Sequence, residues 1–431
     1  MQSFAYKLFM GAMKTSLWSL RRYDRWRAGN PEMRSAEEYR QSPYESYERM
    51  RERGTVIRSY ANQGWFVNGF DEVQELLRDP RFSSDVRRNK FFHRILRVAS
   101  NGLDIPLVDK PAMLNRDPPD HTRLRKLVAP GLINTYIQSL EPMIGELVDE
   151  LLDSIPDQSE FDLIKSLAQP LPAMVIAEMM GVPKVERLLF QSWSEALMGA
   201  TMIDQPQLIE KAARADKEMR AYLHQLVERK YSEPGADLIS MLLNVEQQSD
   251  KLSRDELVSN CILLLTAGHE TTSRLIGNGL YTLMRHPDQM QDLRDNPALM
   301  ANAIEEMLRF ESPIQMTIRF VAQSFWFHGH QFKKNQLIMV GIGAANRDAQ
   351  ANDSPETFDI RRKPIQHVAF GYGIHLCLGM ALARLEGKIV FTRLLERFPL
   401  IRNVDGVPTW GSNPFFRGLA SLRISTVGEE H

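Results

Sequence analysis

The chain has 431 residues, of which 43% are hydrophobic and 25% are charged, as in an ordinary soluble globular protein with a large core. The formal net charge of -1 implies no bulk attraction to nucleic acid, and no run of about 18 uncharged apolar residues predicts a transmembrane helix. The two cysteines, Cys261 and Cys377, cannot build a disulfide framework and fit a reducing compartment.

Residues 1–40 are predicted to form a basic amphipathic extension ahead of the remaining chain. Within residues 1–30, six Lys and Arg stand against Asp24 as the one acidic residue. Helical spacing separates an apolar face from a basic face, a pattern typical of a helix that lies on an anionic membrane surface. A helix packed on the protein body, a segment folded against a partner and a transit peptide are the alternatives.

Two strand-like segments, residues 55–60 and 64–69, open the rest of the chain, and helical periodicity dominates from about residue 119 to 310. The predicted helices there cover residues 121–130, 136–153, 162–180, 207–230, 235–245, 252–285 and 299–310. Strand-like segments follow at residues 317–322, 325–329, 337–342 and 419–425, with a helical pattern at 378–398. We therefore expect a mainly α fold with a small β sheet assembled from both ends, in one domain over residues 41–431.

The longest predicted helix has clear limits at both ends. Ser253 and Glu256 have the spacing of a capping box, and Pro287 provides the stop. About 32 residues lie between them, or roughly 50 Å of helix. Because the middle of this helix is apolar on nearly every side, it must run through the core.

The buried centre of this helix reads "AGHETT" and breaks three local rules. Gly268 costs about 1 kcal/mol relative to Ala in a helix interior. Glu270 is an acid, and acids are seldom buried unpaired. Thr271 and Thr272 can compete for the carbonyl groups of their own helix. Three violations at one point predict a functional reason for them.

The segment "FGYGIHLCLG", residues 370–379, surrounds Cys377 with glycines. Cys261 reads as a small buried hydrophobe, whereas Cys377 comes just before the helical pattern at 378–398. Its sulfur should therefore lie near a helix amino terminus, where the helix dipole and free N–H groups favour a thiolate. The glycines before Cys377 let backbone amides approach the sulfur, and Gly379 lets a flat group lie against the helix.

Two common sites fit this loop poorly. Zinc needs four ligands, and "HLC" supplies at most two, with no second cysteine nearby. A dinucleotide fingerprint fails because Gly371 and Gly373 are followed by Leu376 and no strand–helix–strand unit surrounds them. A single thiolate that faces a large planar ligand indicates haem iron.

These residues carry a resemblance to the cytochromes P-450. "FGYGIHLCLG" matches the haem-binding signature of that family, and "AGHETT" resembles the oxygen-activating segment of its long central helix. "EMLR" at 306–309 is similar to its Glu-x-x-Arg pair. "DPPDHTRLRKLVAPGL" at 117–132 is similar to a segment of its bacterial soluble members that contacts a haem propionate. The resemblance covers nearly the whole chain except the leading 40 residues. It implies the P-450 fold, with haem between the long central helix and the cysteine-loop helix.

The resemblance implies a set of site residues. Cys377, as a thiolate, would be the axial ligand of the iron in haem b (iron protoporphyrin IX), favouring O–O cleavage. Glu306 and Arg309, three apart on one helix face, would form a buried structural pair tied to residues 345–348 and 358–362. Removal of one partner can cost about 3–5 kcal/mol. The other implied haem-binding residues are His121, Arg125, Ala267, Gly268, Arg319, Phe370, Gly371, His375 and Gly379, with His121, Arg125, Arg319 and His375 assigned to the propionates.

The predicted reaction is monooxygenation, in which one oxygen atom of O2 enters a C–H bond of a lipophilic small molecule such as a fatty acid, terpenoid or steroid. Thr271 would donate a hydrogen bond and Glu270, with ordered water, would resupply the proton. Ala267 and Gly268 would leave room for dioxygen. A peroxygenase that consumes hydrogen peroxide and a haem-thiolate sensor or ligand-binding protein are the alternatives, and both make the Glu270–Thr271 pair unnecessary.

The resemblance also implies partners and surroundings. Electrons would come from a ferredoxin system, and the protein is expected in the cytoplasm, with residues 1–30 as a membrane contact at the inner face. Nucleic acid is not expected as a partner. A group of basic residues flanks the expected proximal side and would either attract an acidic partner or form a solvated face: Arg116, Arg123, Lys126, Arg384 and Lys388.

The expected substrate pocket is mostly apolar, which favours a lipophilic substrate. The resemblance implies that its lining comprises Leu264, Ala267, Ile314, Met316, Thr317, Phe415 and Phe416. Four cations, Arg87, Arg88, Lys90 and Arg94, would meet a substrate carboxylate or form an exposed cluster, and we favour the exposed cluster.

Overall fold

The computed structural model describes residues 41–59, 64–100, 102, 104–155, 160–202, 205–246 and 251–427. The amino-terminal extension predicted at residues 1–40, and with it the expected membrane contact, lies outside these ranges. Within the described ranges, no helix combines the length and the apolar character needed to cross a bilayer.

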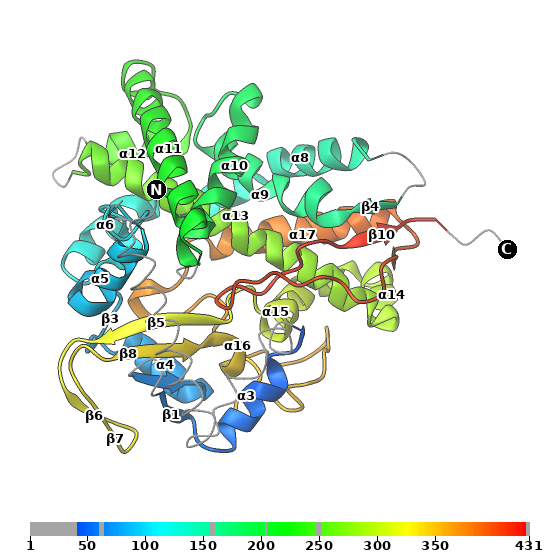
Figure 1. The fold of residues 1–431 in the computed structure, drawn as a ribbon. Coiled ribbons are helices and arrows are strands. Elements are labelled where there is room, and N and C mark those ends of the chain that lie inside the picture. Colours follow the sequence, from blue (N-terminus) through cyan, green and yellow to red (C-terminus); the bar gives the residue numbers. More distant parts are fainter. Residues whose placement is uncertain are drawn as a thin grey trace.

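Helices dominate the described chain (Figure 1). The first eight are α3 (Tyr44–Arg51), α4 (Phe70–Arg78), α5 (Lys90–Ala99), α6 (Asp120–Val128), α7 (Asn134–Ser139), α8 (Glu141–Asp153), α9 (Pro170–Met179) and α10 (Arg187–Met198). They are followed by α11 (Pro206–Ser232), α12 (Leu238–Glu246), α13 (Arg254–Met284), α14 (Pro287–Asp295), α15 (Met300–Phe310), α16 (Ile342–Ala345) and α17 (Met380–Arg397).

The main sheet joins segments from the two ends of the chain, as predicted. Its order is β1-β2-β8-β5-β3, and the β2–β8 pair is parallel whereas the other pairs are antiparallel. The strands are β1 (Val56–Ser59), β2 (Gly64–Val67), β3 (Phe82–Ser83), β5 (Met316–Val321) and β8 (Leu337–Gly341). A separate hairpin comprises β6 (Phe325–Phe327) and β7 (His330–Phe332). The last predicted strand pairs elsewhere: β10 (Arg423–Ser425) lies between β4 (Glu160–Asp162) and β9 (Arg402–Asn403).

Two long predicted helices are interrupted in the structure. The helix expected at 136–153 is divided at Leu140 into α7 and α8, and α8 has a proline in its first turn. The helix expected at 162–180 begins as β4, continues as a π-helical turn at Ile164–Ala168, and becomes α9 only at Pro170. Proline has no backbone N–H to donate, so it starts a new helix more readily than it continues one.

Helix α13 runs through the core, as its sequence indicated (Figure 1). Its capping box is present: the Ser253 hydroxyl accepts from the Glu256 N–H at 3.2 Å, and a Glu256 carboxylate oxygen accepts from the Ser253 N–H at 2.8 Å. Helices α9, α10, α11, α15 and α17 all pack against α13. Since α17 directly follows the cysteine loop, this packing fixes the loop relative to the central helix.

Candidate active site

The cysteine loop is a tight turn that needs its glycines. The Cys377 N–H donates to the Phe370 carbonyl at 2.9 Å. Gly371 and Gly373 have φ of +72° and +70°, the left-handed region that favours glycine. A Cβ on Gly373 would lie 2.4 Å from the carbonyl oxygen of Leu77 in α4. The loop is therefore closed on itself and packed against α4. A side chain at either glycine would strain the left-handed backbone, and a side chain at Gly373 would also clash with α4.

The surroundings of Cys377 change the pKa of its thiol in opposite directions. Burial raises the pKa of the thiol, whereas a hydrogen bond from the Gly379 N–H and the charges of Arg125 and Arg384 act in the opposite direction. A metal ion that replaces the thiol proton would turn this balance toward the thiolate. Beside the sulfur, a Cβ on Gly379 would meet no atom within 4 Å, so there is room for a flat group next to the start of α17.

One stripe of α13 is exposed although the helix lies in the core. Ala267 is exposed, and Leu264, Gly268 and Thr271 are partly exposed, while residues 261–263, 265 and 266 are buried. Positions three and four apart share a helix face. The stripe therefore faces an internal space, and its residues are the ones that the resemblance assigned to the distal side of the haem.

Four basic side chains predicted to bind propionates are brought together from three elements. The Arg125 guanidinium donates to the Leu376 carbonyl at 2.7 Å, and the rings of His121 and His375 are 4.1 Å apart. Burial and the neighbouring charges of Arg319, His121 and Arg125 lower the pKa of His375 to about 3, so this ring is neutral at pH 7. Burial lowers the pKa of Arg319 to about 10, with opposition from Asp117, so Arg319 stays cationic.

This basic cluster has the chemistry of an anion site. His121 has a buried Nδ1 with no hydrogen-bond partner in the described structure, and buried polar atoms normally have one. Arg319 is 9% exposed and donates at 2.8 Å to the carbonyl of Ile318. Two guanidinium groups and an unpartnered imidazole nitrogen can bind carboxylates strongly.

Glu306 and Arg309 form the buried pair that was predicted. Both side chains are fully buried, and two nitrogens of Arg309 donate to the two carboxylate oxygens at 2.7 Å. Arg309 also donates to the carbonyls of Asn346, Pro355 and Thr357. The pair thus anchors α15 to the segment that leads into the cysteine loop.

Three residues of the "AGHETT" segment at the centre of α13 have contacts that account for their presence in a core helix. The Thr271 hydroxyl donates to the carbonyl of Ala267 at 2.8 Å. The Glu270 carboxylate accepts from Arg274 at 2.8 Å, a partner that sequence reasoning missed although Glu and Arg four apart are a recognised helical pair. A Cβ on Gly268 would lie 2.5 Å from Ile176 of α9, so this glycine allows α9 to pack closely on α13.

His269, between these residues, was also missed. Its Nε2–H donates to the Gln169 carbonyl at 2.9 Å, so its Nδ1 accepts from the Ser194 hydroxyl at 2.8 Å. The ring is fully buried, and burial lowers its pKa. It therefore links α13 to α10 and to the start of α9, contacts that no local motif could indicate.

The predicted pocket residues do not all share one wall. Thr317 and Arg319 lie on one face of β5, and the Arg319 guanidinium lies 3.4 Å from the Thr317 hydroxyl. Met316 points to the other face, into a core cluster with Tyr44, Tyr47, Met50, Ile57 and Phe66 that Phe415 also borders. The alternation of side chains along a strand separates Met316 from Thr317. Met316 therefore belongs to this core cluster, and the expectation that it lines the pocket needs correction.

The other two pocket residues lie together. Ile314 and Phe416 form an antiparallel β-bridge, and both are partly exposed. The bridge places the loop around Phe416 beside the start of β5.

Most of the basic residues expected on the proximal side are already paired. Arg384 makes two bonds to Glu305 at 2.7 and 2.8 Å, Arg123 pairs with Glu256, and Lys388 lies 3.3 Å from Glu141. Arg116 is buried and donates to two backbone carbonyls. Lys126 is exposed.

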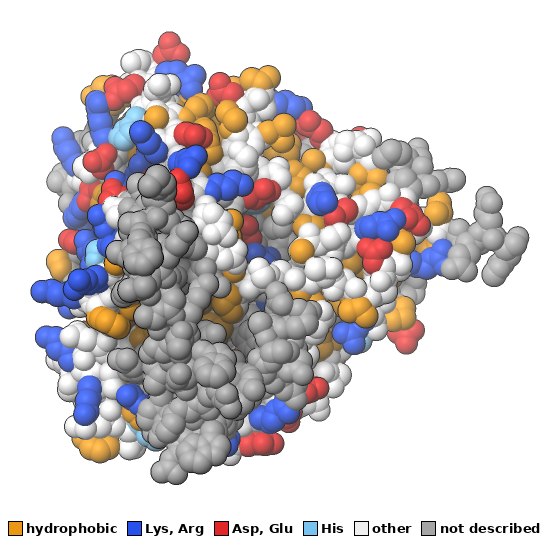
Figure 2. Space-filling model, in the orientation of Figure 1, with side chains coloured by type: hydrophobic (Ala, Val, Ile, Leu, Met, Phe, Trp, Pro, Cys, Tyr) orange, Lys and Arg blue, Asp and Glu red, His pale blue; other side chains and the backbone are white. Residues whose placement is uncertain are grey.

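The cations near α5 form a mixed surface. Arg87 pairs with Asp85 and Arg88 with Asp117, both at 2.7 Å. Lys90 and Arg94 are exposed, and Figure 2 shows Lys and Arg side chains over the α5 edge of the molecule. This agrees with the exposed-cluster interpretation that the sequence favoured.

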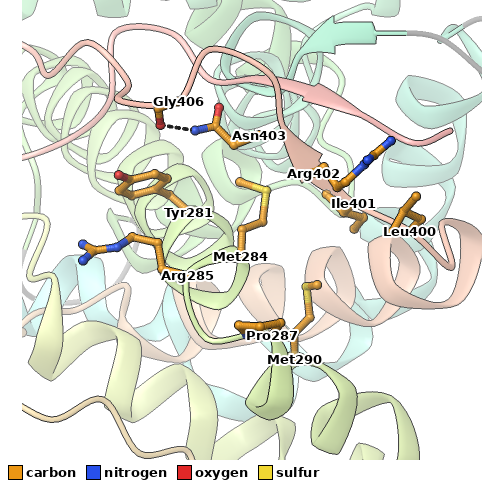
Figure 3. A pocket seen from close by; sticks show the side chains of 10 residues that line it. All are labelled: Tyr281, Met284, Arg285, Pro287, Met290, Leu400, Ile401, Arg402, Asn403 and Gly406. Atoms are coloured by element: carbon orange, nitrogen blue, oxygen red, sulfur yellow. Dashed lines mark hydrogen bonds between the residues drawn. The ribbon is translucent and has the colours of Figure 1, made fainter. Parts of the chain in front are cut away.

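A cavity of about 460 Å³ lies at the carboxyl end of α13 (Figure 3). None of its lining residues was predicted for the site: Tyr281, Met284, Arg285, Pro287, Met290, Leu400, Ile401, Arg402, Asn403 and Gly406. In the described chain, no cluster of three or more His, Cys, Asp or Glu could hold a metal ion.

Comparison with known proteins decides the family. The model of the family described as Cytochrome P450 matches residues 66–411. The chain belongs to the cytochrome P450 family. It is 41% identical over 392 residues to cytochrome P450 107B1 of Saccharopolyspora erythraea, an alignment that covers 90% of this chain and 95% of the relative. It is 38% identical to vitamin D(3) 25-hydroxylase of Pseudonocardia autotrophica, with 89% and 94% covered.

A solved P450 structure agrees with this assignment. Myxobacterial CYP267B1 in complex with myristic acid superposes with a TM-score of 0.84 at 36% identity, covering 93% of this chain and 100% of the other. The fold is therefore the P450 fold, and the enzyme is a P450 monooxygenase of a family that uses haem iron. The residues present fit that group: a lone cysteine, open space beside Gly379, an exposed stripe on α13 and a basic cluster with an unpartnered nitrogen.

Proposed function

We propose that this P450 hydroxylates a lipophilic small molecule such as a fatty acid, terpenoid or steroid, with haem b as cofactor and electrons from an external ferredoxin system. The exposed stripe at Leu264, Ala267 and Thr271 carries the proposal, because it sets an apolar wall directly beside a hydroxyl and an acid. A relative named as a vitamin D(3) hydroxylase and a similar structure in complex with myristic acid support this substrate class.

Haem b, when bound, supplies the redox chemistry of its iron. Cys377 would hold the iron through its sulfur, and the basic cluster of His121, Arg125, Arg319 and His375 would bind the propionates. Apolar side chains on this stripe, such as Leu264, would exclude water once haem and substrate are bound, which would strengthen the polar interactions that remain. The Thr271 hydroxyl would leave the Ala267 carbonyl to donate a hydrogen bond into the space beside Ala267, and Glu270 would replace the proton of that hydroxyl through ordered water.

The proposal includes partners and location. An acidic ferredoxin would dock on the proximal side, where Lys126 is exposed and where Arg123, Arg384 and Lys388 would exchange their present carboxylate partners for those of the ferredoxin. We place the enzyme in the cytoplasm and assign residues 1–30 to contact with the inner face of the membrane. Both statements follow from charge pattern and family.

The ligand is tested first. Purified wild type supplied with haemin is expected to give the reduced carbonyl spectrum of thiolate ligation, and Cys261→Ser to keep it. Cys377→Ser is expected to lose that spectrum. A histidine-type spectrum in fully folded wild type would contradict the proposal.

The reaction is tested by turnover and by ligand binding. Fatty acids, terpenoids and steroids are screened for a shift of the resting haem from low to high spin, and the compounds that bind are given dioxygen, NADPH and a ferredoxin system. Hydroxylated product is expected, with Thr271→Ala diverting electrons to hydrogen peroxide. Product with hydrogen peroxide alone would favour a peroxygenase, and spectral binding without any turnover would favour a sensor.

A further inference from the structure

Arg274 lies one helical turn after Glu270 on α13 and forms a half-buried ion pair with it. An Arg274 terminal nitrogen donates to a Glu270 carboxylate oxygen at 2.8 Å, and the two side chains are 16% and 15% exposed. The Nε of Arg274 is buried without a hydrogen-bond partner in the described structure. Water screens such a pair less than it screens a surface pair.

The carboxyl-terminal loop is shaped around the same arginine. A Cβ on Gly418 would lie 2.5 Å from Cγ of Arg274, and a Cβ on Gly411 would lie 3.7 Å from one of its terminal nitrogens. The two glycines are themselves joined by a hydrogen bond from the Gly411 N–H to the Gly418 carbonyl at 2.8 Å. Gly411 and Gly418 therefore leave a space for the Arg274 side chain, and the side chain of an alanine at position 418 would fill that space.

The Phe416 ring borders the same space, and Phe416 is one of the residues expected to line the substrate pocket. The guanidinium carbon of Arg274 lies 5.6 Å from the centre of the Phe416 ring, within the range of a cation–π interaction. Phe416 forms the β-bridge with Ile314. One side chain thus connects the acid on the central helix to a loop that borders the pocket.

We propose that Arg274 is a positioning residue that couples the 411–418 loop to proton delivery by Glu270. The guanidinium holds the carboxylate turned toward the loop. In each turnover the carboxylate takes a proton from solvent as it leaves Arg274, passes that proton on beside Thr271, and returns to Arg274 as the anion. A substrate that displaces Phe416 shifts the guanidinium and opens the pair. This inference rests on the proposed function.

The test uses the haem-loaded full chain in three variants. Arg274→Gln removes the charge, Arg274→Lys keeps it, and Arg285→Gln is the control, since Arg285 is an exposed arginine at the end of the same helix. NADPH oxidation, product and hydrogen peroxide are measured from pH 6 to 9 with myristic acid as the probe substrate. Hydrogen exchange of peptides covering residues 411–418 is measured in parallel.

Removal of the cation leaves the Glu270 carboxylate without its ion-pair partner. In Arg274→Gln the yield of product per NADPH is therefore expected to fall several-fold below that of the wild type across the pH range, with more hydrogen peroxide released. Arg274→Lys should restore much of the product yield. Exchange at residues 411–418 should become several-fold faster in Arg274→Gln and stay unchanged in Arg285→Gln.

Two outcomes would overturn the inference. An Arg274→Gln profile that superposes on the wild type with the same product yield would show that Arg274 does not position Glu270. Unchanged exchange at 411–418 would show that it does not hold the loop. If wild type itself yields no product from any lipophilic probe, the proposed function fails, and the exchange data alone then decide whether the arginine connects helix and loop.

Discussion

Glu386 offers the sharpest test of the electrostatics of this fold. It lies on α17 among the buried residues Leu382, Leu385, Ile389 and Val390, and it is 1% exposed. One carboxylate oxygen has no hydrogen-bond partner in the described structure. Burial raises the pKa of this carboxyl from its ordinary 4.5 to about 8, so Glu386 is uncharged at neutral pH in the folded enzyme.

The size and sign of the effect follow by linkage. The unfolded chain releases the proton near pH 4.5 and the folded chain near pH 8, so unfolding releases a proton at every pH between these values. The contribution to stability is complete below pH 4.5 and is lost as the pH rises through about 8. Each pH unit costs about 1.4 kcal/mol, or roughly 5 kcal/mol over the whole interval.

The assay is urea unfolding of the haem-loaded enzyme from pH 5.5 to 7.5. Wild type should lose about 2.5 kcal/mol of unfolding free energy through this one group across that range. Glu386→Gln, which keeps the shape and cannot ionise, should lack this loss. The control is Glu396→Gln, because Glu396 is exposed on the same helix. Parallel pH curves for wild type and Glu386→Gln would refute the reasoning, since they would mean that Glu386 ionises as easily in the folded state as in the unfolded chain.

Two further predictions concern the haem site and its support. Arg309→Met leaves the Glu306 carboxylate buried without its main cation and should cost about 3–5 kcal/mol in urea unfolding, with reduced haem content. A loss below about 1 kcal/mol would contradict this assignment. Arg319→Gln should raise the rate of haem transfer to apomyoglobin about tenfold, since a charge-assisted bond to a propionate contributes roughly 1.5–3 kcal/mol. Arg361→Gln, at an exposed arginine, should leave that rate unchanged.

The features that sequence could predict are those encoded within a few residues. The capping box at Ser253 and Glu256 and the pairing of Glu306 with Arg309 each depend on two residues three apart, so helical geometry alone brings the partners together. The burial of the second pair was implied by the family resemblance and not by the spacing. Local spacing is sufficient wherever both partners belong to one turn.

Some features had a local signal that was not used. In α4, Phe70, Val73, Leu76 and Leu77 are buried at helical spacing, yet no helix was predicted there. The Glu270–Arg274 pair is also local, since the acid precedes the base by four residues on one helix.

Other features depend on contacts between distant segments. The partner of His269 is Ser194, 75 residues earlier, and the orientation of Met316 depends on how β5 pairs with β8. A one-residue change of register would exchange the two faces of β5. Neither contact leaves a mark in the local sequence.

The three local violations in "AGHETT" prove to have three separate causes. Gly268 is explained by the close approach of Ile176, a requirement of packing between α9 and α13. Glu270 can lie largely out of water because Arg274 forms an ion pair with it, and the Thr271 hydroxyl donates to the carbonyl of Ala267. A functional role is therefore not needed to explain why Gly268 is tolerated. For Glu270 and Thr271 the proposed proton delivery would supply the reason, since replacing a buried ion pair by apolar residues is often neutral for stability.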